Sequence, residues 1–423
     1  MRFCHQLGLC TVLVWLACAA LGQTPVNSQK VGKAKQVGAW PGSNGAGEDK
    51  RTELSGHRTV RGAKLSSRPC PIPVRYVYGE DRDWIRQPYR LGVVLIDMRD
   101  TKHAPAHTAS WAEQMLFARD QYHVTPGGEA SFGSVADWLD AQSLGRFRFT
   151  GRVFDWVTVD LAFAEIEALS HKEGRERFLQ AAMAEVRARD GQQCLEDFDG
   201  LFFMHAGPIG KNILWSHRAD IDGRRYITTF EMDRINVICH EFGHVLGLPD
   251  LYAKKGLRET FGPWCAMASG YRGKYPGSFC VWSKARIGWS RPTVIDAARQ
   301  QKLVLRPIQE HPDDALLIPL NRKDGIGAEF LMLENRAAKG NDAERQAGLL
   351  IWRVTRDPDS NGFPSFTLTL PGPDDGATDQ QRDRIVAWPG AKADRFVAKS
   401  ELTAVLSHIR REGELVFFEV GPK

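Results

Sequence analysis

The stretch HEFGHVLGLPDLY, residues 240–252, places two histidines four residues apart, with a glutamate directly after the first. Because a helix turns by about 100° per residue, His240 and His244 would point the same way and offer two imidazole nitrogens to one tetrahedral Zn²⁺. Glu241, beside the first histidine, can take a proton from a water molecule held there. The stretch therefore predicts a zinc site with Glu241 as the general base.

The chain after the second histidine supplies a candidate for the third ligand. Gly247 permits a sharp change of direction and Pro249 stiffens the return, so that Asp250 arrives one turn beyond the helix. A carboxylate lowers the charge of the site and leaves the fourth position for water and substrate. Glu259, fifteen residues beyond His244, is the rival, in which case Asp250 would orient a histidine. We expect Asp250 to be the ligand.

A chance occurrence of the motif is the alternative interpretation. With 12 His in 423 residues, HExxH alone should arise in roughly one such chain in fifty. The extended motif on a capped helix is much rarer, which favours the zinc site. Thr228, with Glu231 three residues on, forms a capping box and predicts a helix from there to about Leu246. We expect the apolar residues of this helix to be buried: Met232, Ile235, Phe242, Val245 and Leu246.

The composition is that of a globular protein with an export signal. Hydrophobic residues make up 43% of the chain, which is ordinary. Arg2, the apolar run LGLCTVLVWLACAA and the small residues around Gly22 predict a signal peptide over residues 1–22. No later apolar run is long enough to span a membrane. We expect a secreted protein; a periplasmic protein, or one lipid-anchored through Cys18, is the alternative.

The formal net charge of +5 is unevenly distributed. Arg2 contributes +1 and residues 23–69 contribute +6, from nine Lys/Arg against three Asp/Glu, which leaves −2 for the remainder. A nearly neutral folded part gives little support to nucleic-acid binding. The basic stretch is rich in Gly, Ser, Lys and Gln, which predicts a disordered leader or short pro-segment over residues 23–85.

Residues 86–292 mix the patterns of strands and helices. RLGVVLIDM (90–98) is a buried-strand run, and SVADWLDAQS (134–143) has helical spacing. A long helix is expected over residues 162–189, with a break near Gly174.

Strands dominate from about residue 293, in the runs KLVLRPI, ALLIPL, AEFLMLENR, GLLIWRV and GELVFFEV. The order of the patterns predicts an α+β fold, with a catalytic domain over residues 86–292 and a β-rich domain over 293–423.

The sequence resembles the immune inhibitor A-like secreted metallopeptidases, which belong to the zincin group, from about residue 90 to 370. The resemblance implies a zincin peptidase domain, zinc as the metal, endopeptidase hydrolysis and an extracellular setting, and it carries over to His240, His244 and Glu241. One departure is Ala253, where the family usually has an acid, so the local role of that acid in calcium binding or loop anchoring is in doubt. The matching stretches are DWLDAQSLGRFRFTGRVFDWVTV, FDGLFFMHAG, LWSHRAD, ICHEFGHVLGLPDLY, GPWCAMASGY, VWSKARIGW, EFLMLENR and GLLIWRV.

The resemblance also interprets two residues of CAMASGY. Met267 looks like the methionine of a turn beneath the metal, where a flexible thioether packs under the imidazoles. Tyr271 can donate a hydrogen bond to the oxyanion formed when water attacks the peptide carbonyl, and an ordinary loop tyrosine is an equal alternative. His205 and His217 lack the spacing of ligands, and we expect them to be structural.

Five cysteines follow the predicted signal peptide, so at least one cannot pair within the chain. Cys265 and Cys280 are closest in sequence and form the favoured disulfide, whereas Cys239 is expected to be a small buried hydrophobe. A thiolate of Cys70, in SRPCPIP, could fill the open zinc position until the leader is removed. Pairing of Cys70 with Cys194, or no role, is favoured over this latency.

Calcium is a second candidate ion. DPDSNG, at residues 357–362, matches the opening of a calcium loop, but Leu368 stands at the twelfth position, where such loops have glutamate. A solvated turn is the favoured interpretation.

Taken together, the patterns predict a secreted, monomeric zinc endopeptidase that acts on proteins or peptides. An edge strand near residues 212–217 would hold the substrate extended. The alternative from another class is a catalytically silent exported binding or matrix protein on the same scaffold, which the presence of all expected catalytic groups disfavours. A non-peptidase metallohydrolase is the third hypothesis.

Overall fold

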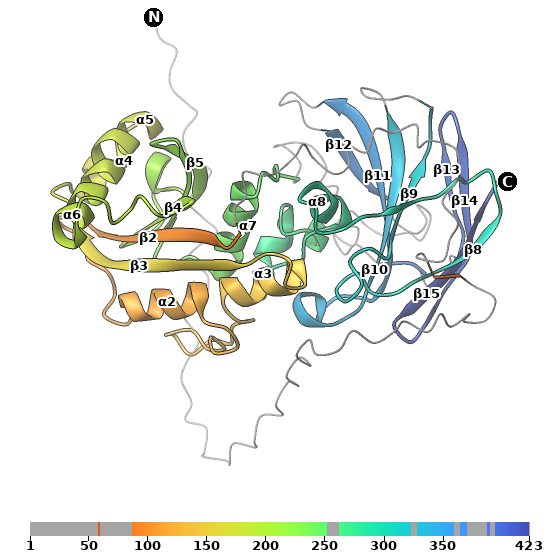
Figure 1. Cartoon of the computed structure of the whole chain (residues 1–423), viewed down its shortest axis with the longest axis horizontal. Helices are drawn as coiled ribbons and strands as arrows, with labels where there is room; N and C mark the ends of the chain where they lie inside the picture. The colour runs from red at the N-terminus through yellow and green to blue at the C-terminus, as the bar shows by residue number, and fades with distance from the viewer. Residues whose placement is uncertain are drawn as a thin grey trace, which may run out of the picture. The chain divides into compact units, whose positions relative to one another are not determined.

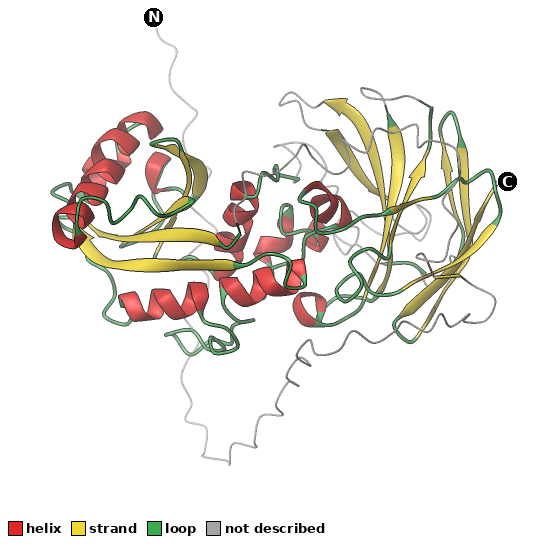
Figure 2. Ribbon diagram, viewed as in Figure 1, coloured by secondary structure: helices red, strands yellow, loops and turns green. Residues whose placement is uncertain are grey.

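The computed structural model describes residues 58–59, 87–251, 262–322, 328–358, 364–369, 387–389 and 394–422. All of them belong to one compact unit, Glu53–Lys423. Helices and strands together make the α+β fold that the sequence predicts (Figure 2). Among the described residues, no helix combines the length and the apolar character that crossing a membrane requires.

The first sheet is built from β2 (Tyr89–Asp97), β3 (Phe149–Thr158), β4 (Gly200–His205), β5 (His217–Ile221) and β6 (Arg224–Phe230). The order across the sheet is β3-β2-β4-β6-β5 (Figure 1). The first four strands in this order are parallel, and β5 pairs antiparallel with β6 as an edge strand. Because β2 is buried on both faces, its apolar run is continuous rather than alternating.

Helices cover both faces of this sheet (Figure 1). On one face, α2 (Ala109–Phe117), α3 (Val135–Ser143) and α7 (Ile235–Val245) share a core with β2 and β4. The other face carries α4 (Phe163–Glu167), α5 (His171–Gly174), the π-helical turn η2 (Arg175–Leu179) and α6 (Gln180–Asp190). The motif helix α7 is therefore a core element of the sheet layer.

The long helix expected over residues 162–189 is interrupted elsewhere than predicted. The break lies between Glu167 and His171. At Gly174 the chain stays helical, but α5 gives way there to the π-helical turn η2. A side chain at Gly174 would place its Cβ 2.5 Å from the Cβ of Ile213. The glycine thus serves the close packing of the helix rather than ending it.

Three short helices follow the undescribed residues 252–261. They are η4 (Gly262–Trp264), η5 (Ser269–Arg272) and α8 (Val281–Arg286). Trp264 of η4 and the buried apolar residues of α8 (Val281, Trp282 and Ala285) belong to the same core as α7.

The remaining strands form two further sheets, ordered β1-β8-β15-β14-β13 and β12-β11-β10-β9-β7, which share a core. All five strand runs that the sequence predicts beyond residue 293 lie in them. The 3-10 turn η6 (Gly340–Asp342) follows β10. The strands are β1 (Arg58–Thr59), β7 (Thr293–Val294), β8 (Gln301–Leu305), β9 (Ala315–Pro319), β10 (Glu329–Arg336), β11 (Gly348–Pro358), β12 (Pro364–Thr369), β13 (Phe396–Lys399), β14 (Thr403–Glu412) and β15 (Leu415–Gly421).

Strand β10 is apolar on both faces. Leu331 and Leu333 enter the core shared by the two C-terminal sheets, whereas Met332 enters the core of α7. Because strand side chains alternate, Glu334 and Arg336 lie on the same face as Met332. The proposed domain division at residue 293 stays a prediction, and the core of α7 extends across that position.

Helix α7 begins at Ile235, so the predicted start at Thr228 is wrong. Thr228 lies in β6, where its hydroxyl donates to the carbonyl of Ile213 at 3.2 Å. Met232, expected on the buried side of the helix, precedes it and is 64% exposed. The Thr-x-x-Glu pattern is local, and the strand pairing of Thr228 with β4 and β5 overrides it.

Glu231, the other half of the predicted capping box, binds three distant groups instead. Its carboxylate accepts hydrogen bonds from the backbone N–H groups of Ala104 and Gly207, both at 2.9 Å, and contacts Nδ1 of His107 at 2.8 Å. Glu231 therefore ties the loops after β2 and β4 to the chain that leads into α7.

Candidate metal centre and active site

The end of α7 turns the chain back toward the two histidines. Gly247 has φ of +86°, and its N–H donates to the carbonyl of His244 at 2.9 Å. The N–H of Leu248 donates to the carbonyl of Gly243 at 3.0 Å. These two bonds make a Schellman motif, which requires the left-handed conformation that glycine adopts without strain. Gly247 thus has the role that the sequence predicts.

Both histidines are held with the same nitrogen turned outward. Nδ1 of His240 lies 2.8 Å from the carbonyl of Ala266, and Nδ1 of His244 lies 2.7 Å from that of Leu248. A carbonyl only accepts hydrogen bonds, so each Nδ1 carries the proton. Each Nε2 therefore keeps its lone pair when the ring is neutral, as a metal ligand requires.

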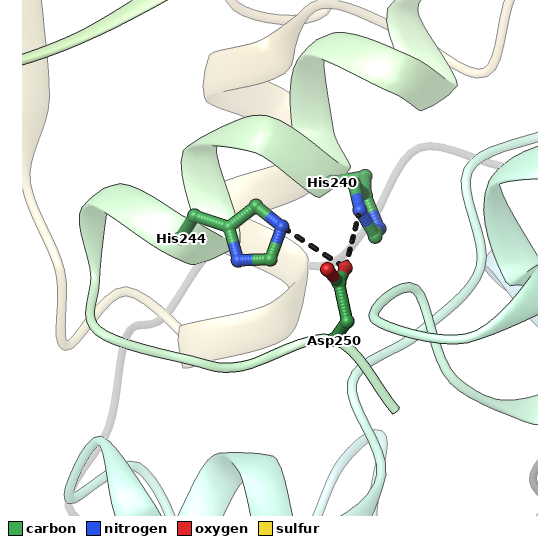
Figure 3. A group of neighbouring side chains, drawn as sticks. All are labelled: His240, His244 and Asp250. Carbon is green, nitrogen blue, oxygen red and sulfur yellow. Dashed lines mark ion pairs between the residues drawn. The ribbon is translucent and has the colours of Figure 1, made fainter. Parts of the chain in front are cut away.

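Asp250 points back at the two imidazoles from the loop beyond the helix (Figure 3). Its Oδ1 lies 3.2 Å from Nε2 of His240 and 3.1 Å from Nε2 of His244. One ligand atom from each of the three residues lies within 4.8 Å of the others, the only such group of three or more His, Cys, Asp or Glu in the described part of the chain. The structure thus brings the three predicted ligands together.

The charges in this cluster are strongly coupled. Burial raises the pKa of Asp250, but hydrogen bonds with His240 and His244 outweigh it and hold the pKa well below its usual range. For His244, burial lowers the pKa, and Asp250 more than reverses this. The carboxylate is therefore ionised and suited to a cation between the two rings.

Glu241 lies next to this cluster on α7, and its side chain is buried. Burial raises its pKa above the usual value, against the lowering effect of His240 and His244. A carboxylate with a raised pKa accepts and returns a proton more readily near neutral pH, which is the behaviour of a general base.

Met267 packs against α7 at Gly243, and its place beneath the metal stays a prediction. Its side chain is fully buried, and its sulfur would lie 2.3 Å from a Cβ placed on Gly243. Gly243 stands between the two histidines in the sequence, so only a residue without a side chain admits the thioether there. The carbonyl of Met267 also accepts the N–H of Leu251 at 2.7 Å, which fixes the residue after Asp250.

Tyr271 lies close to the candidate metal ligands. Its ring centroid is 5.0 Å from that of His240, and its hydroxyl accepts a hydrogen bond from Nε of Arg272 at 3.2 Å. No hydrogen bond from the phenolic proton to another described residue is found. Asn236, buried on the histidine side of α7, donates to the carbonyl of Gly273 at 2.6 Å and so anchors the turn that carries Tyr271.

The lone histidines have structural partners. His205 is buried between the carbonyls of Ala206 and Leu214, at 2.9 and 3.2 Å. His217 contacts the carbonyl of Trp215 at 2.5 Å, and burial lowers its pKa to about 4. Both predictions of a structural role agree with this geometry.

Cys265 and Cys280 are neighbours but do not form the favoured disulfide. Both are buried free thiols, and each sulfur contacts the hydroxyl of Ser283, at 3.7 and 3.4 Å respectively. The N–H of Cys280 donates to the sulfur of Cys265 at 3.4 Å. Cys239 is fully buried, as expected, and burial raises the pKa of its thiol well above the usual value. Cys194 is a partly buried free thiol.

Several predictions fall outside the described residues. They concern the signal peptide and leader, Cys70, Ala253, the rival ligand Glu259 and most of the DPDSNG turn, while no side chain is described at Leu368. The choice between Asp250 and Glu259 therefore stays a prediction, and so do latency and calcium binding.

Sequence reasoning missed the groups that hold the site in place. The carbonyls of Ala266 and Leu248 are backbone atoms, which no side-chain pattern reveals. Arg336, whose guanidinium donates to the carbonyl of Phe279 at 2.9 Å, comes from a strand 50 residues beyond α8. The sequence signal for this role was the pair Glu334 and Arg336 at the end of the mainly apolar run of β10.

Two imidazoles and a buried glutamate on one helix, with an ionised aspartate on the loop that follows it, make a metallopeptidase type of centre. The sheet beside them ends in β5, which no other described strand pairs on its outer edge. Residues 204–287 match the family described as immune inhibitor A peptidase M6, catalytic domain. This match confirms the predicted resemblance over the segment that holds the motif, and it supports a metallopeptidase with a protein substrate. No curated protein matches the chain.

Proposed function

We propose that the protein is a secreted zinc-dependent endopeptidase. The observation that carries the proposal is the convergence of His240, His244 and Asp250, with Glu241 beside them, inside the segment that matches a peptidase catalytic domain. Export is proposed from the N-terminal signal pattern alone.

The donor set fits zinc. Two nitrogens and one carboxylate oxygen are the ligands of many catalytic zinc sites, and three protein ligands leave a position for substrate. The carbonyls of Ala266 and Leu248 fix both ring orientations in advance. When bound, zinc supplies Lewis acidity, which lowers the pKa of water and polarises a carbonyl.

Glu241 moves the proton in this proposal. Its carboxylate takes a proton from the attacking water and then delivers it to the nitrogen of the leaving amine. Its burial strengthens this role, because few competing waters reach the carboxylate. Tyr271 is the candidate donor to the oxyanion, because its hydroxyl accepts from Arg272 and its ring lies against His240.

Strand β5 is the proposed substrate platform. It pairs with β6 on one side, and no other described strand pairs with its second edge. An extended peptide can add to such an edge through backbone hydrogen bonds. The strand begins at His217, later than the expected 212–217, because residues 212–214 form the 3-10 turn η3 (Asn212–Leu214).

The direct test uses the purified full-length protein and unfolded casein. We expect hydrolysis that stops with a chelator and returns with a stoichiometric amount of Zn²⁺. Glu241→Gln should bind the same amount of zinc without hydrolysis. A wild-type protein that binds zinc but cleaves neither casein nor a pool of peptides would instead be the catalytically silent binding protein.

A further inference from the structure

We infer that Arg336 is a positioning residue of the candidate metal centre, an inference that rests on the proposed zinc function. Its side chain is fully buried. Nη2 donates to the carbonyl of Phe279 at 2.9 Å and reaches that of Trp264 at 3.5 Å. Arg336 thus holds both ends of residues 264–279, which we call the support segment.

The support segment contacts one candidate ligand, His240, directly and a second, Asp250, through the residue that follows it. The carbonyl of Ala266 accepts the hydrogen bond of His240 at 2.8 Å. The carbonyl of Met267 accepts that of Leu251, the residue after Asp250, at 2.7 Å. A shift of this segment therefore moves a histidine and the carboxylate loop together.

The connection from Arg336 to these carbonyls is short. The N–H of Ala266 donates to the carbonyl of Ser278 at 2.9 Å, and Ser278 directly precedes Phe279. The hydroxyl of Ser278 donates to Oδ2 of Asp342 at 2.9 Å, and the same oxygen accepts Nη1 of Arg336 at 2.8 Å. Arg336 thus binds the residue next to Ser278, and Ser278 holds Ala266, whose carbonyl orients His240.

The geometry needs an arginine rather than any cation. Nε donates to Glu334 at 2.9 Å, Nη1 donates to Asp342 at 2.8 Å, and Nη2 turns to the carbonyl of Phe279 at 2.9 Å. A planar guanidinium presents these donors in fixed directions, whereas a lysine ammonium is a single point. Arg336→Lys therefore keeps the charge and loses the hold on the support segment.

The expected consequence is weaker metal binding. Groups that orient metal ligands typically change metal affinity about 10–100-fold when they are replaced. We expect Arg336→Lys in the full-length protein to lower the affinity for Zn²⁺ about 10-fold or more, measured by competition with a chromophoric chelator. The visible absorption of the Co²⁺-substituted protein should change as well, because its bands follow the ligand geometry.

Two matched controls separate positioning from stability. Leu331→Ala, on the opposite face of β10, removes a fully buried side chain from the core of the C-terminal sheets. It should lower the unfolding temperature at least as much and leave zinc affinity and the Co²⁺ spectrum unchanged. Arg353→Lys alters an ion pair with Glu329 at the other end of β10 and should do the same with a smaller loss of stability.

A second variant covers the case that Arg336→Lys does not fold. The double variant Arg336→Met with Glu334→Gln removes the guanidinium and one carboxylate charge together. The glutamine at position 334 still offers an oxygen to Nε1 of Trp352, and Asp342 keeps its ion pair with Arg345 at 3.2 Å. The same loss of zinc affinity is expected.

Three results are informative. A folded Arg336 variant with the zinc affinity and Co²⁺ spectrum of the wild type would overturn the inference. Equal loss of affinity in Leu331→Ala would also overturn it, because stability alone would then explain the effect. If the wild type binds zinc without hydrolysing peptides, the proposed function fails while the role of Arg336 in metal binding is still decided by the affinities.

Discussion

Two charged clusters contact the support segment, and they differ in how completely their charges are satisfied. In the buried cluster, the side chains of Glu334, Arg336 and Asp342 are 0% exposed and bind one another at 2.8–2.9 Å. In the other cluster, the side chain of Asp250 is 42% exposed and one of its oxygens faces two imidazole nitrogens.

The difference separates a structural ion cluster from a candidate binding site. Buried charges that are fully paired cost much to disrupt but offer no position to a ligand. In the other cluster, a partly exposed carboxylate and two Nε2 atoms converge on one point, while each Nδ1 is already bonded to a carbonyl. Such a group of ligand atoms remains open to a cation. Variants at Asp250 and Glu241 should therefore change affinity or activity directly. Variants of the buried cluster should lower stability, and at Arg336 they should also change zinc affinity through the support segment.

The largest effect is expected for Glu241→Gln, which removes the proton acceptor and keeps the shape of the side chain. The rate of casein hydrolysis should fall by about 10³-fold or more, because general base catalysis is lost. Zinc content, measured by atomic absorption, should stay at the wild-type value. Glu185→Gln, an exposed change on α6, is the control and should be fully active. Substantial activity of the zinc-loaded Glu241→Gln protein would contradict the proposed mechanism.

Asp250→Ala should come next, with a fall in zinc affinity of more than about 100-fold, since losing a ligand exceeds the effect of losing an orienting group. Isothermal titration with Zn²⁺ measures it. Glu259→Ala is the matched comparison and should bind zinc like the wild type. The opposite pair of results would assign the ligand role to Glu259.

The sequence predicted what depends on local spacing. The four-residue interval of His240 and His244 and the turn at Gly247 are set within one helix and its end, so their geometry follows from the motif. The apolar runs beyond residue 293 likewise became strands, because a short apolar run is a local signal for a buried strand.

The failures arose where distant residues decide the outcome. Thr228 and Glu231 match a capping box, yet Thr228 is taken by strand pairing, and Glu231 contacts His107, 124 residues away in the sequence. Arg336 was invisible as a partner of the support segment for the same reason. Only the fold brings β10 against the residues that follow α7.

Glu334→Gln should show the stability signature of the buried cluster. It removes one carboxylate charge beside Arg336 and keeps an oxygen for Trp352, so we expect the free energy of unfolding to fall by about 3 kcal/mol. Urea denaturation followed by fluorescence measures the change. Glu329→Gln, in the more exposed pair with Arg353 on the same strand, should cost at most about 1 kcal/mol. Equal losses of unfolding free energy in the two variants would contradict the distinction between fully buried and partly exposed ion pairs.

The smallest effect concerns Lys284, a buried lysine in α8 beside the same cluster. Burial, followed by the charge of Arg336, lowers its pKa from 10.5 to about 8. Between pH 8 and pH 10.5 the unfolded chain therefore holds a proton that the folded protein has released, so the free energy of unfolding rises with pH in this window. Below pH 8 both states are protonated and the full cost of the buried charge is present.

Lys284→Met, which has no charge to bury, isolates this contribution. From pH 8 to pH 10.5 the wild type should gain about 1–3 kcal/mol of unfolding free energy relative to the variant, since each unit of pKa shift corresponds to about 1.4 kcal/mol. Urea denaturation of both proteins at several pH values in this range measures the difference, and other titrating groups cancel because both proteins share them. A difference that does not change with pH would mean that Lys284 stays charged in the fold, where it and Arg336 would balance the carboxylates of Glu334 and Asp342.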